Sequence, residues 1–206
     1  MIKIENVETY GWEAAIRGAR NPMNSWDKSD TVRYALDLDP ELGPNDLRLL
    51  QKLANAGTDH GKFLRMITVT MDITAPLYWW KEFDTYKVGT TANSCSTMHK
   101  IHAKTFTMDD FSAENLTPGA MDVMVEIICE LNFQRNAFLD TKDKSHWYSM
   151  IQLLPTSYNQ RRTVLLNYQV LKAMYHARKN HKLNEWREFC QFIESLPYSE
   201  LIIGDT

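Results

Sequence analysis

The stretch ITVTMDIT, residues Ile67–Thr74, alternates apolar with polar side chains along its whole length. Side chains of a β-strand point alternately to the two faces of a sheet, so this period of two predicts a strand with one buried face and one polar face. Pro76 follows closely, and proline suits the first turn of a helix. We therefore expect a strand that leads directly into a helix with the sequence LYWWKEFDTYKV, residues 77–88.

The chain before this strand carries weaker patterns. Apolar residues alternate over Met1–Glu8, which predicts a short strand, and GWEAAIRGAR (11–20) reads as a brief helix. Residues 24–44 are acidic and rich in turn formers. Leucines at helical spacing then predict a helix that is capped by Asn45 or Asp46 and stopped by a glycine at 57.

Helical patterns dominate the chain after residue 100. Thr117 followed by Pro118 is a cap-and-first-turn pair, and it predicts a long helix whose core-facing positions are Met121, Met124, Val125, Ile128, Leu131 and Leu139. Leu154-Pro155 separates this helix from the next. Residues 163–179 and 183–196 both read as amphipathic helices, joined by the short connection KNHK.

These elements predict a protein of the α+β class, with a small mixed or antiparallel sheet flanked by long helices. With 206 residues, 44% of them hydrophobic, the chain is long enough for one substantial core and hardly long enough for two. We expect a single domain over residues 1–206.

Charge and cysteine content narrow the class of protein further. Lys and Arg number 23 against 26 Asp and Glu, a formal net charge of -3, so no overall basic field recruits nucleic acid or an anionic membrane. The three cysteines are widely separated and odd in number, which is typical of reduced thiols rather than of a disulfide framework. No apolar stretch is long enough to span a membrane. We expect a soluble, cytoplasmic protein.

The polar stretch KEFDTYKVGTTANSCSTMHK, residues 81–100, gathers hydroxyl side chains around a single glycine, Gly89. Hydroxyls and backbone N–H groups near Gly89, with Lys87 beside them, suit an anion such as phosphate. Cys95 is a candidate nucleophile if a neighbouring cation lowers its pKa. The alternative is an ordinary polar turn with a small, inert cysteine.

Cys95, His99 and His102 form the pattern C-x3-H-x2-H, which would bind zinc if a fourth ligand such as His60 came near. Closed zinc sites normally show paired ligands at both ends of the motif, and this spacing lacks such pairs. We therefore predict no metal site and interpret the histidines as surface residues of a polar loop.

Asn167, Arg178, His181 and Glu185 form a second polar constellation near the ends of two consecutive helices. The guanidinium of Arg178 is a rigid donor fork that suits a carboxylate, a phosphate or the edge of a uracil ring. The alternative is a solvated arginine in the last turn of a helix, where the helix dipole favours a cation, followed by a capping histidine.

The run LLPTSYNQRRTVLLNYQVLKAMYHARKNHKLNEW, residues 153–186, resembles the C-terminal signature of flavin-dependent thymidylate synthases. In that family Leu-Pro leads to Asn-x-Arg, then to an Arg, and then to His-x-x-x-Glu. The matching positions here are Leu154-Pro155, Asn167, Arg178, His181 and Glu185, with Gln169 where the family usually has the Arg of Asn-x-Arg.

The upstream half is similar to the same family in layout. LANAGTDHGKFLRMITVTMDITAPLYWWKEF (53–83) matches its leucine-rich helix, Gly-His turn, strand and Ala-Pro junction. The signature R-H-R-x-x-S that follows in the family falls on Thr85-Tyr86-Lys87 and Thr90. Without a gap, its later Asn-Glu falls on Ala92-Asn93 and its second Ser on Cys95. With a one-residue insertion, the Asn falls on Asn93 and the second Ser on Ser96.

This resemblance implies a homotetramer with active sites at subunit junctions, where FAD and dUMP bind and a methylene group passes from methylenetetrahydrofolate to the uracil ring with NADPH as reductant. It also implies roles for individual residues. The nucleotide and the catalysis would involve Arg178, Cys95 and Ser96. Contacts to the flavin and to phosphate would come from Asn167, His181, Lys87, Tyr86, Thr90 and Asn93.

The departure from the family pattern at Thr85-Tyr86-Lys87 is chemically large. One lysine stands where the family often has two arginines, and no imidazole remains. Lysine is a poor substitute for a bidentate arginine, and electrostatic stabilisation is commonly the largest catalytic effect. The alternative interpretation is therefore a non-catalytic oligomeric homologue that keeps the fold and binds a nucleotide or another protein.

Overall fold

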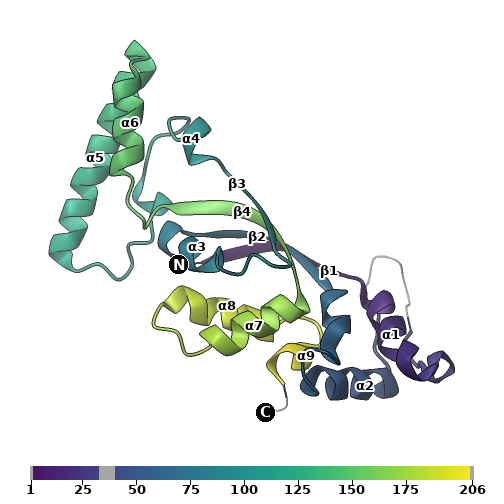
Figure 1. Ribbon diagram of the computed structural model, residues 1–206. Coiled ribbons are helices and arrows are strands. Elements are labelled where there is room, and N and C mark those ends of the chain that lie inside the picture. The colour runs from purple at the N-terminus through teal and green to yellow at the C-terminus, as the bar shows by residue number, and fades with distance from the viewer. Residues whose placement is uncertain (1, 33–39, 205–206) are drawn as a thin grey trace. The chain divides into compact units, whose positions relative to one another are not determined.

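The computed structural model of the protein describes residues 2–32 and 40–204 (Figure 1). These residues form two compact units. Unit 1 consists mainly of Ile73–Thr85 and Asn93–Arg162, and unit 2 consists mainly of Ile4–Asp72, Tyr86–Ala92 and the chain from Thr163 onward. Part of the turn-rich stretch predicted over residues 24–44 lies outside the described residues.

The described residues form a four-stranded antiparallel sheet in the order β1-β2-β4-β3. The strands are β1 (Lys3–Tyr10), β2 (Thr68–Pro76), β3 (Thr91–Ser94) and β4 (Asn159–Asn167). The predicted fold class, a small antiparallel sheet with helices, is confirmed. In β2 the side chains of Val69, Met71 and Ile73 are buried and alternate with half-buried polar residues, as the period of two predicts.

The prediction of one helix over residues 163–179 is wrong in its first part. The strand β4 continues to Asn167, and the helix α7 (Tyr168–Arg178) begins only after it. Val164 and Leu166 are buried whereas Leu165 between them is 42% exposed, which is the alternation of a strand. Because the apolar part of this run, residues 164–166, is only three residues long, its period is hard to distinguish from a helical one in the sequence.

The polar stretch 81–100 is more structured than a loop. The helix α3 (Leu77–Phe83) ends before Asp84, earlier than predicted, and its Trp79, Trp80 and Phe83 are buried against one another. Thr91–Ser94 then forms the exposed edge strand β3, followed by the single-turn helix α4 (Thr97–Lys100). Backbone pairing with β4 thus decides a segment that its own side chains mark only as polar.

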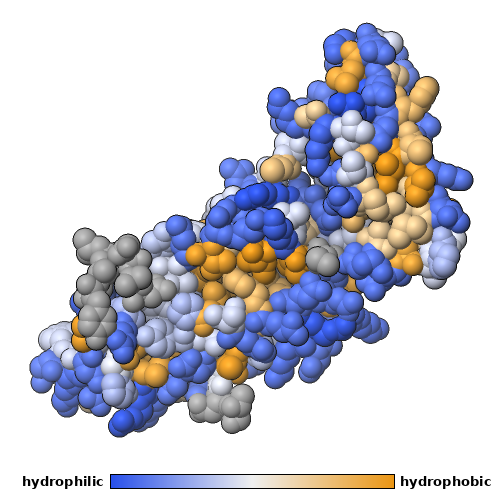
Figure 2. All heavy atoms as spheres, turned by 180° about the vertical axis from the view of Figure 1, so that it is seen from behind, coloured by the Kyte–Doolittle hydropathy of each residue, from blue (hydrophilic) through white to orange (hydrophobic). Residues whose placement is uncertain are grey.

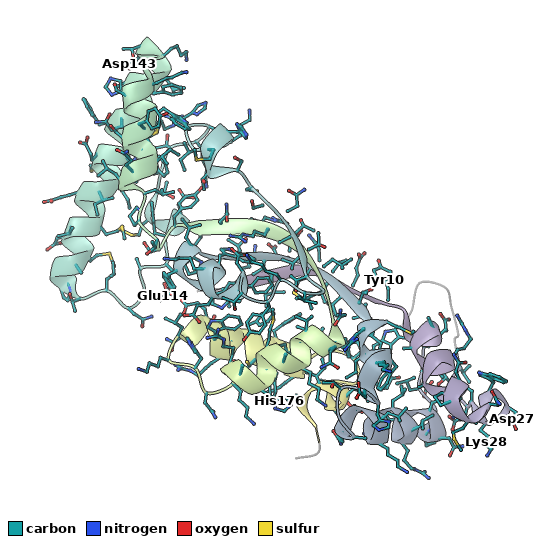
Figure 3. The ribbon with its side chains drawn as sticks, viewed as in Figure 1. Tyr10, Asp27, Lys28, Glu114, Asp143 and His176 are labelled. Atoms are coloured by element: carbon teal, nitrogen blue, oxygen red, sulfur yellow. The ribbon has the colours of Figure 1, made fainter. Side chains whose placement is uncertain are left out.

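Unit 1 also contains a helical hairpin. The predicted long helix begins at Pro118 as expected, but it does not continue to Leu154-Pro155. It is divided into α5 (Pro118–Thr141) and α6 (Lys144–Leu153), which pack against each other. Lys142 adopts a positive φ of 60° between them, and Asp143 at the tip of the hairpin accepts a hydrogen bond from the Ser145 N–H (Figure 3). The buried core of this unit includes Ile101, Phe106, Phe111, Met124, Leu131 and Met150. Val125, expected in that core, is 48% exposed.

In unit 2, helices lie around the start of β2 and the end of β4 (Figure 1). They are α1 (Trp12–Arg20), α2 (Pro44–Asn55), α7, α8 (Asn184–Glu194) and α9 (Glu200–Ile203), with 3-10 turns at Asn21–Met23, Trp26–Lys28 and Gly61–Arg65. A further 3-10 turn, Met108–Asp110, belongs to unit 1. The helices α1 and α8 lie where the sequence predicts them. In the part of the chain that the structure describes, no helix is both long and apolar enough to cross a membrane.

The predicted cap of α2 is wrong. The helix begins at Pro44, with Gly43 as its N-cap residue, and Asp46 turns inward instead. Asp46 is 0% exposed and accepts a hydrogen bond of 2.6 Å from the Arg20 Nε, so α1 and α2 are joined by a buried ion pair. Pro44 at the first helical position has no N–H to satisfy, and the next two N–H groups, of Asn45 and Asp46, donate to the Asp30 carboxylate at 2.9 and 3.0 Å.

Candidate functional site

Arg178 is the last residue of α7, and its side chain turns back onto Tyr86. The Arg178 Nε donates a hydrogen bond of 3.0 Å to the Tyr86 hydroxyl, and the guanidinium carbon lies 5.7 Å from the centre of the Tyr86 ring. Both side chains are half-buried. The predicted position of Arg178 in the last helical turn is confirmed, but the side chain is held by an aromatic partner rather than simply solvated.

Trp186, near the start of α8, packs against both Arg178 and Tyr86. It is 0% exposed, and its ring lies 4.9 Å from the Arg178 guanidinium carbon and 6.2 Å from the Tyr86 ring. A guanidinium over an indole face within about 6 Å is an attractive cation–π arrangement. We did not predict Trp186 as a site residue, because a lone aromatic residue at a helix start looks like core in the sequence.

His181 joins the same group through Trp186, with ring centres 6.3 Å apart. Its backbone N–H donates to the Arg178 carbonyl at 2.8 Å, and its Nδ1 accepts from the Leu183 N–H at 3.2 Å. These bonds close the turn between α7 and α8. An Nδ1 that accepts a hydrogen bond places the proton of a neutral imidazole on Nε2, so Nε2 is the atom that would donate to a ligand.

Glu185, the acidic member of the predicted constellation, is buried in the first turn of α8. The N-terminal end of a helix favours a carboxylate through the helix dipole. Arg178, His181 and Glu185 therefore all lie around the α7–α8 turn, as the spacing of the sequence predicts.

Asn167 stands at the other end of α7. Its Oδ1 accepts a hydrogen bond of 3.0 Å from the Val170 N–H, so it is the N-cap of the helix. Its amide nitrogen faces Gly89, where an added Cβ would lie 2.9 Å away. Gly89 has a φ of 80°, a backbone conformation that glycine adopts without strain. The segment 86–92 therefore packs closely on the start of α7.

Lys87 and Thr90 lie on either side of this glycine contact. Lys87 is exposed. The Thr90 Oγ1 is buried and has no hydrogen-bond partner among the described residues. A buried polar atom of this kind is normally satisfied by a water molecule or a ligand. The Thr90 hydroxyl, which the family resemblance assigns to phosphate binding, can therefore still form a hydrogen bond.

The remaining predicted residues, Asn93, Cys95 and Ser96, belong to unit 1. Asn93 lies on the exposed strand β3, and Cys95 is an exposed free thiol whose backbone N–H donates to the Arg161 carbonyl at 2.9 Å. The Ser96 hydroxyl caps α4 by accepting from the His99 N–H at 3.1 Å. Ser96 therefore has a structural task that the sequence did not reveal.

The guanidinium of Arg162, on β4, is held by several contacts next to the end of α3 in unit 1. Its guanidinium carbon lies 4.1 Å above the Trp80 ring, its Nη1 lies 2.7 Å from Asp84, and its Nε donates to the Gln160 side chain at 3.0 Å. Trp79 and Trp80 are both 0% exposed and belong to the core.

The structure thus brings together one part of the predicted site, within unit 2. Tyr86, Arg178 and His181 meet around Trp186, while Lys87, Thr90 and Asn167 adjoin the Gly89 contact. In residues 2–32 and 40–204 no group of three or more His, Cys, Asp or Glu side chains is arranged to hold a metal ion.

Tyr175 precedes Arg178 on α7 but serves another contact. Its hydroxyl lies 2.8 Å from the Glu194 carboxylate of α8, and this hydrogen bond raises the pKa of Tyr175 to about 12. Burial raises the pKa of Cys190, also on α8, to about 11. This thiol therefore stays protonated and unreactive near neutral pH.

The fold is similar to those of solved enzyme structures that hold uracil nucleotides. Thymidylate synthase X from Helicobacter pylori, in a crystal structure with FAD and dUMP, has a TM-score of 0.72 and 14% sequence identity over 98% of this chain and 98% of that chain. A second structure of the H. pylori flavin-dependent thymidylate synthase, also complexed with FAD and dUMP, has a TM-score of 0.71 and 15% identity over the same 98% of each chain.

A UMP/dUMP methylase, PolB from Streptomyces cacaoi bound with 5-Br dUMP, is similar over 95% of this chain and 89% of its own, with a TM-score of 0.63 and 14% identity. No protein-family model matches the sequence, and no curated protein matches it. The chain has the fold of the flavin-dependent thymidylate synthases, as the resemblance of its sequence predicts.

Proposed function

We propose, from the fold that this chain shares with flavin-dependent thymidylate synthases, that it binds dUMP and methylates the uracil ring with FAD as cofactor. The observation that carries the proposal is the Arg178 group. An arginine whose guanidinium is already oriented by Tyr86 and Trp186 suits the carbonyl edge of uracil or a phosphate. Arg178 is also the position at which the family resemblance expects the nucleotide contact.

The residues near the Gly89 contact fit a flavin nucleotide. The Thr90 hydroxyl, which has no hydrogen-bond partner within residues 2–32 and 40–204, offers a donor for phosphate oxygens, and the exposed Lys87 offers a positive charge. Further contacts to the flavin would come, by resemblance, from Asn167, Asn93, Tyr86 and the His181 Nε2. When bound, FAD would accept reducing equivalents from NADPH and support the transfer of the methylene group of methylenetetrahydrofolate to dUMP.

Within this proposal Cys95 and Ser96 would contact the nucleotide by resemblance, with Arg178 as the main anchor. The Cys95 side chain is exposed, whereas the Ser96 hydroxyl already caps α4.

We also propose a homotetramer, which places active sites at subunit junctions. The outer face of α5 supports an assembly of this kind, because Val125 and Phe133 are exposed on it at intervals that share one helical face. Figure 2 shows apolar side chains gathered on the hairpin of α5 and α6. Large exposed apolar residues grouped on one face are typical of contact surfaces between proteins.

Two measurements on the purified protein test the proposed activity. The visible absorption spectrum before and after addition of FAD should show bound flavin, and NADPH oxidation should depend on dUMP and methylenetetrahydrofolate. Arg178→Ala should abolish this oxidation while far-UV circular dichroism remains unchanged. A colourless protein that takes up no FAD and binds no dUMP would exclude the proposal.

The second candidate is a nucleotide-binding homologue without methylating activity. It is favoured by one observation: Thr85 and Lys87 are exposed on both sides of Tyr86, where the family signature has arginines. Calorimetry with dUMP separates the two candidates. Binding of dUMP without any dUMP-dependent NADPH oxidation, in protein saturated with FAD, would support this second function and exclude the first.

A further inference from the structure

We propose that Arg162 binds the phosphate group of dUMP, in place of the arginine that the chain lacks at Thr85. This inference rests on the proposed function, because it concerns the same nucleotide. The resemblance of the sequence gives Arg162 no role. Its guanidinium nevertheless lies beside Asp84, the residue that directly precedes Thr85.

Arg162 brings a guanidinium to the end of α3, where the family signature begins. The first arginine of that signature falls on Thr85, which is exposed in this chain. Asp84 follows the last residue of α3, and its Oδ1 accepts a hydrogen bond of 2.7 Å from the Arg162 Nη1. Asp84 and Arg162 are 78 positions apart, so no short sequence motif records that one arginine stands near the place of another.

Three partners hold the Arg162 guanidinium in one orientation. Its Nε donates to the Gln160 Oε1 at 3.0 Å, its Nη1 donates to Asp84, and its carbon lies 4.1 Å from the centre of the Trp80 ring. Trp80 is 0% exposed, and its Nε1 donates to the Gln160 carbonyl at 2.9 Å, so the indole is itself fixed. An arginine that is ordered before the ligand arrives loses less side-chain entropy on binding.

Gln160, which is buried, connects Arg162 to Cys95. Its Oε1 accepts from Arg162, while its Nε2 donates to the Cys95 carbonyl at 2.9 Å. One carboxamide therefore lies between the guanidinium and the backbone of a residue that the resemblance places at the nucleotide. Residues 84, 95, 160 and 162 all belong to unit 1.

The guanidinium keeps donors for a ligand. Gln160 accepts from one of its five N–H groups and Asp84 from another, and no further acceptor for it lies within residues 2–32 and 40–204. The Arg162 side chain is 15% exposed, so a ligand can reach it from solvent. Phosphate oxygens are acceptors that fit the paired donors of an arginine.

Asp84 distinguishes a phosphate contact from a purely structural ion pair. If Arg162 only ties the end of α3 to β4, Asp84 completes that tie, and loss of either side chain has the same consequence. If Arg162 binds phosphate, the Asp84 carboxylate, whose side chain is 49% exposed, repels the second anion. Removal of its charge should then favour the nucleotide.

Isothermal titration calorimetry tests the inference in the full-length protein saturated with FAD. The ligands are dUMP and 2′-deoxyuridine, which lacks the phosphate. Arg162→Gln should weaken dUMP binding about tenfold or more, because a hydrogen bond between charged groups is lost, and should leave deoxyuridine binding unchanged. Asp84→Asn keeps an acceptor for the Arg162 Nη1 without the charge, so it should bind dUMP as tightly as the wild type or more tightly.

Arg161→Gln is the matched control. It removes the same charge one position earlier on β4, where the side chain points to the opposite face of the strand, and dUMP binding should not change. Unfolding temperatures establish that each variant is folded. If Arg162→Gln does not fold, Arg162→Lys takes its place. Lysine keeps the charge but lacks the fork, so only dUMP should lose affinity.

The outcomes separate the phosphate contact from the proposed function. A wild type that prefers dUMP to deoxyuridine, with this preference reduced by substitution of Arg162 but not in Asp84→Asn or Arg161→Gln, supports the contact. An unchanged preference, equal losses for both ligands, or the same loss in either of the other variants overturns it and leaves the proposed function standing. A wild type that binds no dUMP overturns the proposed function and the phosphate contact together.

Discussion

Gly89 and Asn167 approach each other so closely that a Cβ on the glycine would lie 2.9 Å from the Asn167 amide nitrogen and 3.2 Å from the Val170 Cγ2. This contact fixes the segment 86–92 on the start of α7. The same segment carries Tyr86, Lys87 and Thr90. The positions of these three predicted site residues therefore depend on the absence of a side chain at Gly89.

Gly89→Ala should destabilise the protein and weaken nucleotide binding. The φ of 80° strains an alanine by about 1–2 kcal/mol, and the new Cβ would add a steric cost of about 1 kcal/mol or more. Gly57→Ala is the matched control, because Gly57 has a φ of 100° and nothing within 4 Å of an added Cβ. Urea unfolding should show a larger loss for Gly89→Ala. Equal losses in the two variants would show that the contact with Asn167 contributes nothing.

Substitutions of Asn167 should separate its cap from any contact with a flavin. Asn167→Ala removes the acceptor for the Val170 N–H and should lower the free energy of unfolding by about 1 kcal/mol. Asn167→Asp keeps an acceptor at the helix start and should retain stability. Because it lacks the amide donor, it should lose affinity for FAD in a fluorescence titration if Asn167 contacts the flavin. Unchanged FAD affinity in Asn167→Asp would limit the residue to capping.

Because Asp46 and Arg20 form a buried ion pair, the free energy of unfolding should decrease at acid pH. Burial alone would raise the pKa of Asp46, but hydrogen bonds from Thr31, Ser29 and Arg20 outweigh it and lower that pKa. The unfolded chain, with an Asp pKa of about 3.9, therefore binds the proton more readily than the folded one. The stabilisation is present above pH about 4 and is lost as the pH falls through the lower folded value.

Asp46→Asn tests this pH dependence by thermal unfolding between pH 3 and pH 7. At pH 7 the variant should lose about 3–5 kcal/mol, because the buried Arg20 loses its charged partner. Its stability should then change less steeply with pH than that of the wild type. Asp27→Asn, on an exposed 3-10 turn, should stay within about 0.5 kcal/mol of the wild type at every pH. Parallel pH curves for wild type and Asp46→Asn would contradict the assignment.

Phe133→Asp should break the proposed tetramer into smaller species. Phe133 is 62% exposed on the outer face of α5, and a carboxylate there would be costly to bury in a subunit contact. Met23→Asp is the control, because Met23 is 81% exposed in the 3-10 turn Asn21–Met23 and belongs to a different unit. Analytical ultracentrifugation should show a reduced mass only for Phe133→Asp. A monomeric wild type, or an unchanged Phe133→Asp assembly, would exclude this face as the contact.

The sequence alone determined the elements whose signals are local. The period of two over Ile67–Thr74 predicts a strand. The proline that begins α5 and the apolar spacing of α8 predict helices. Each signal is local, because the direction of a side chain follows from backbone geometry within a few residues. The order of short motifs around Arg178 and His181 also pointed to the correct fold, although identity to the solved structures is only 14–15%.

Tertiary structure decided what depends on partners distant in the chain. β3 is a strand because it pairs with β4, and residues 163–167 are a strand although they read as helix. Asp46 pairs with Arg20 instead of capping its helix. Tyr86 and Arg178, 92 residues apart in the chain, meet beside Trp186, whose ring centre lies 6.2 Å from the Tyr86 ring centre and 4.9 Å from the Arg178 guanidinium carbon. A sequence pattern records which faces are apolar, but the free energy of burying a polar group depends on the partner that folding brings to it.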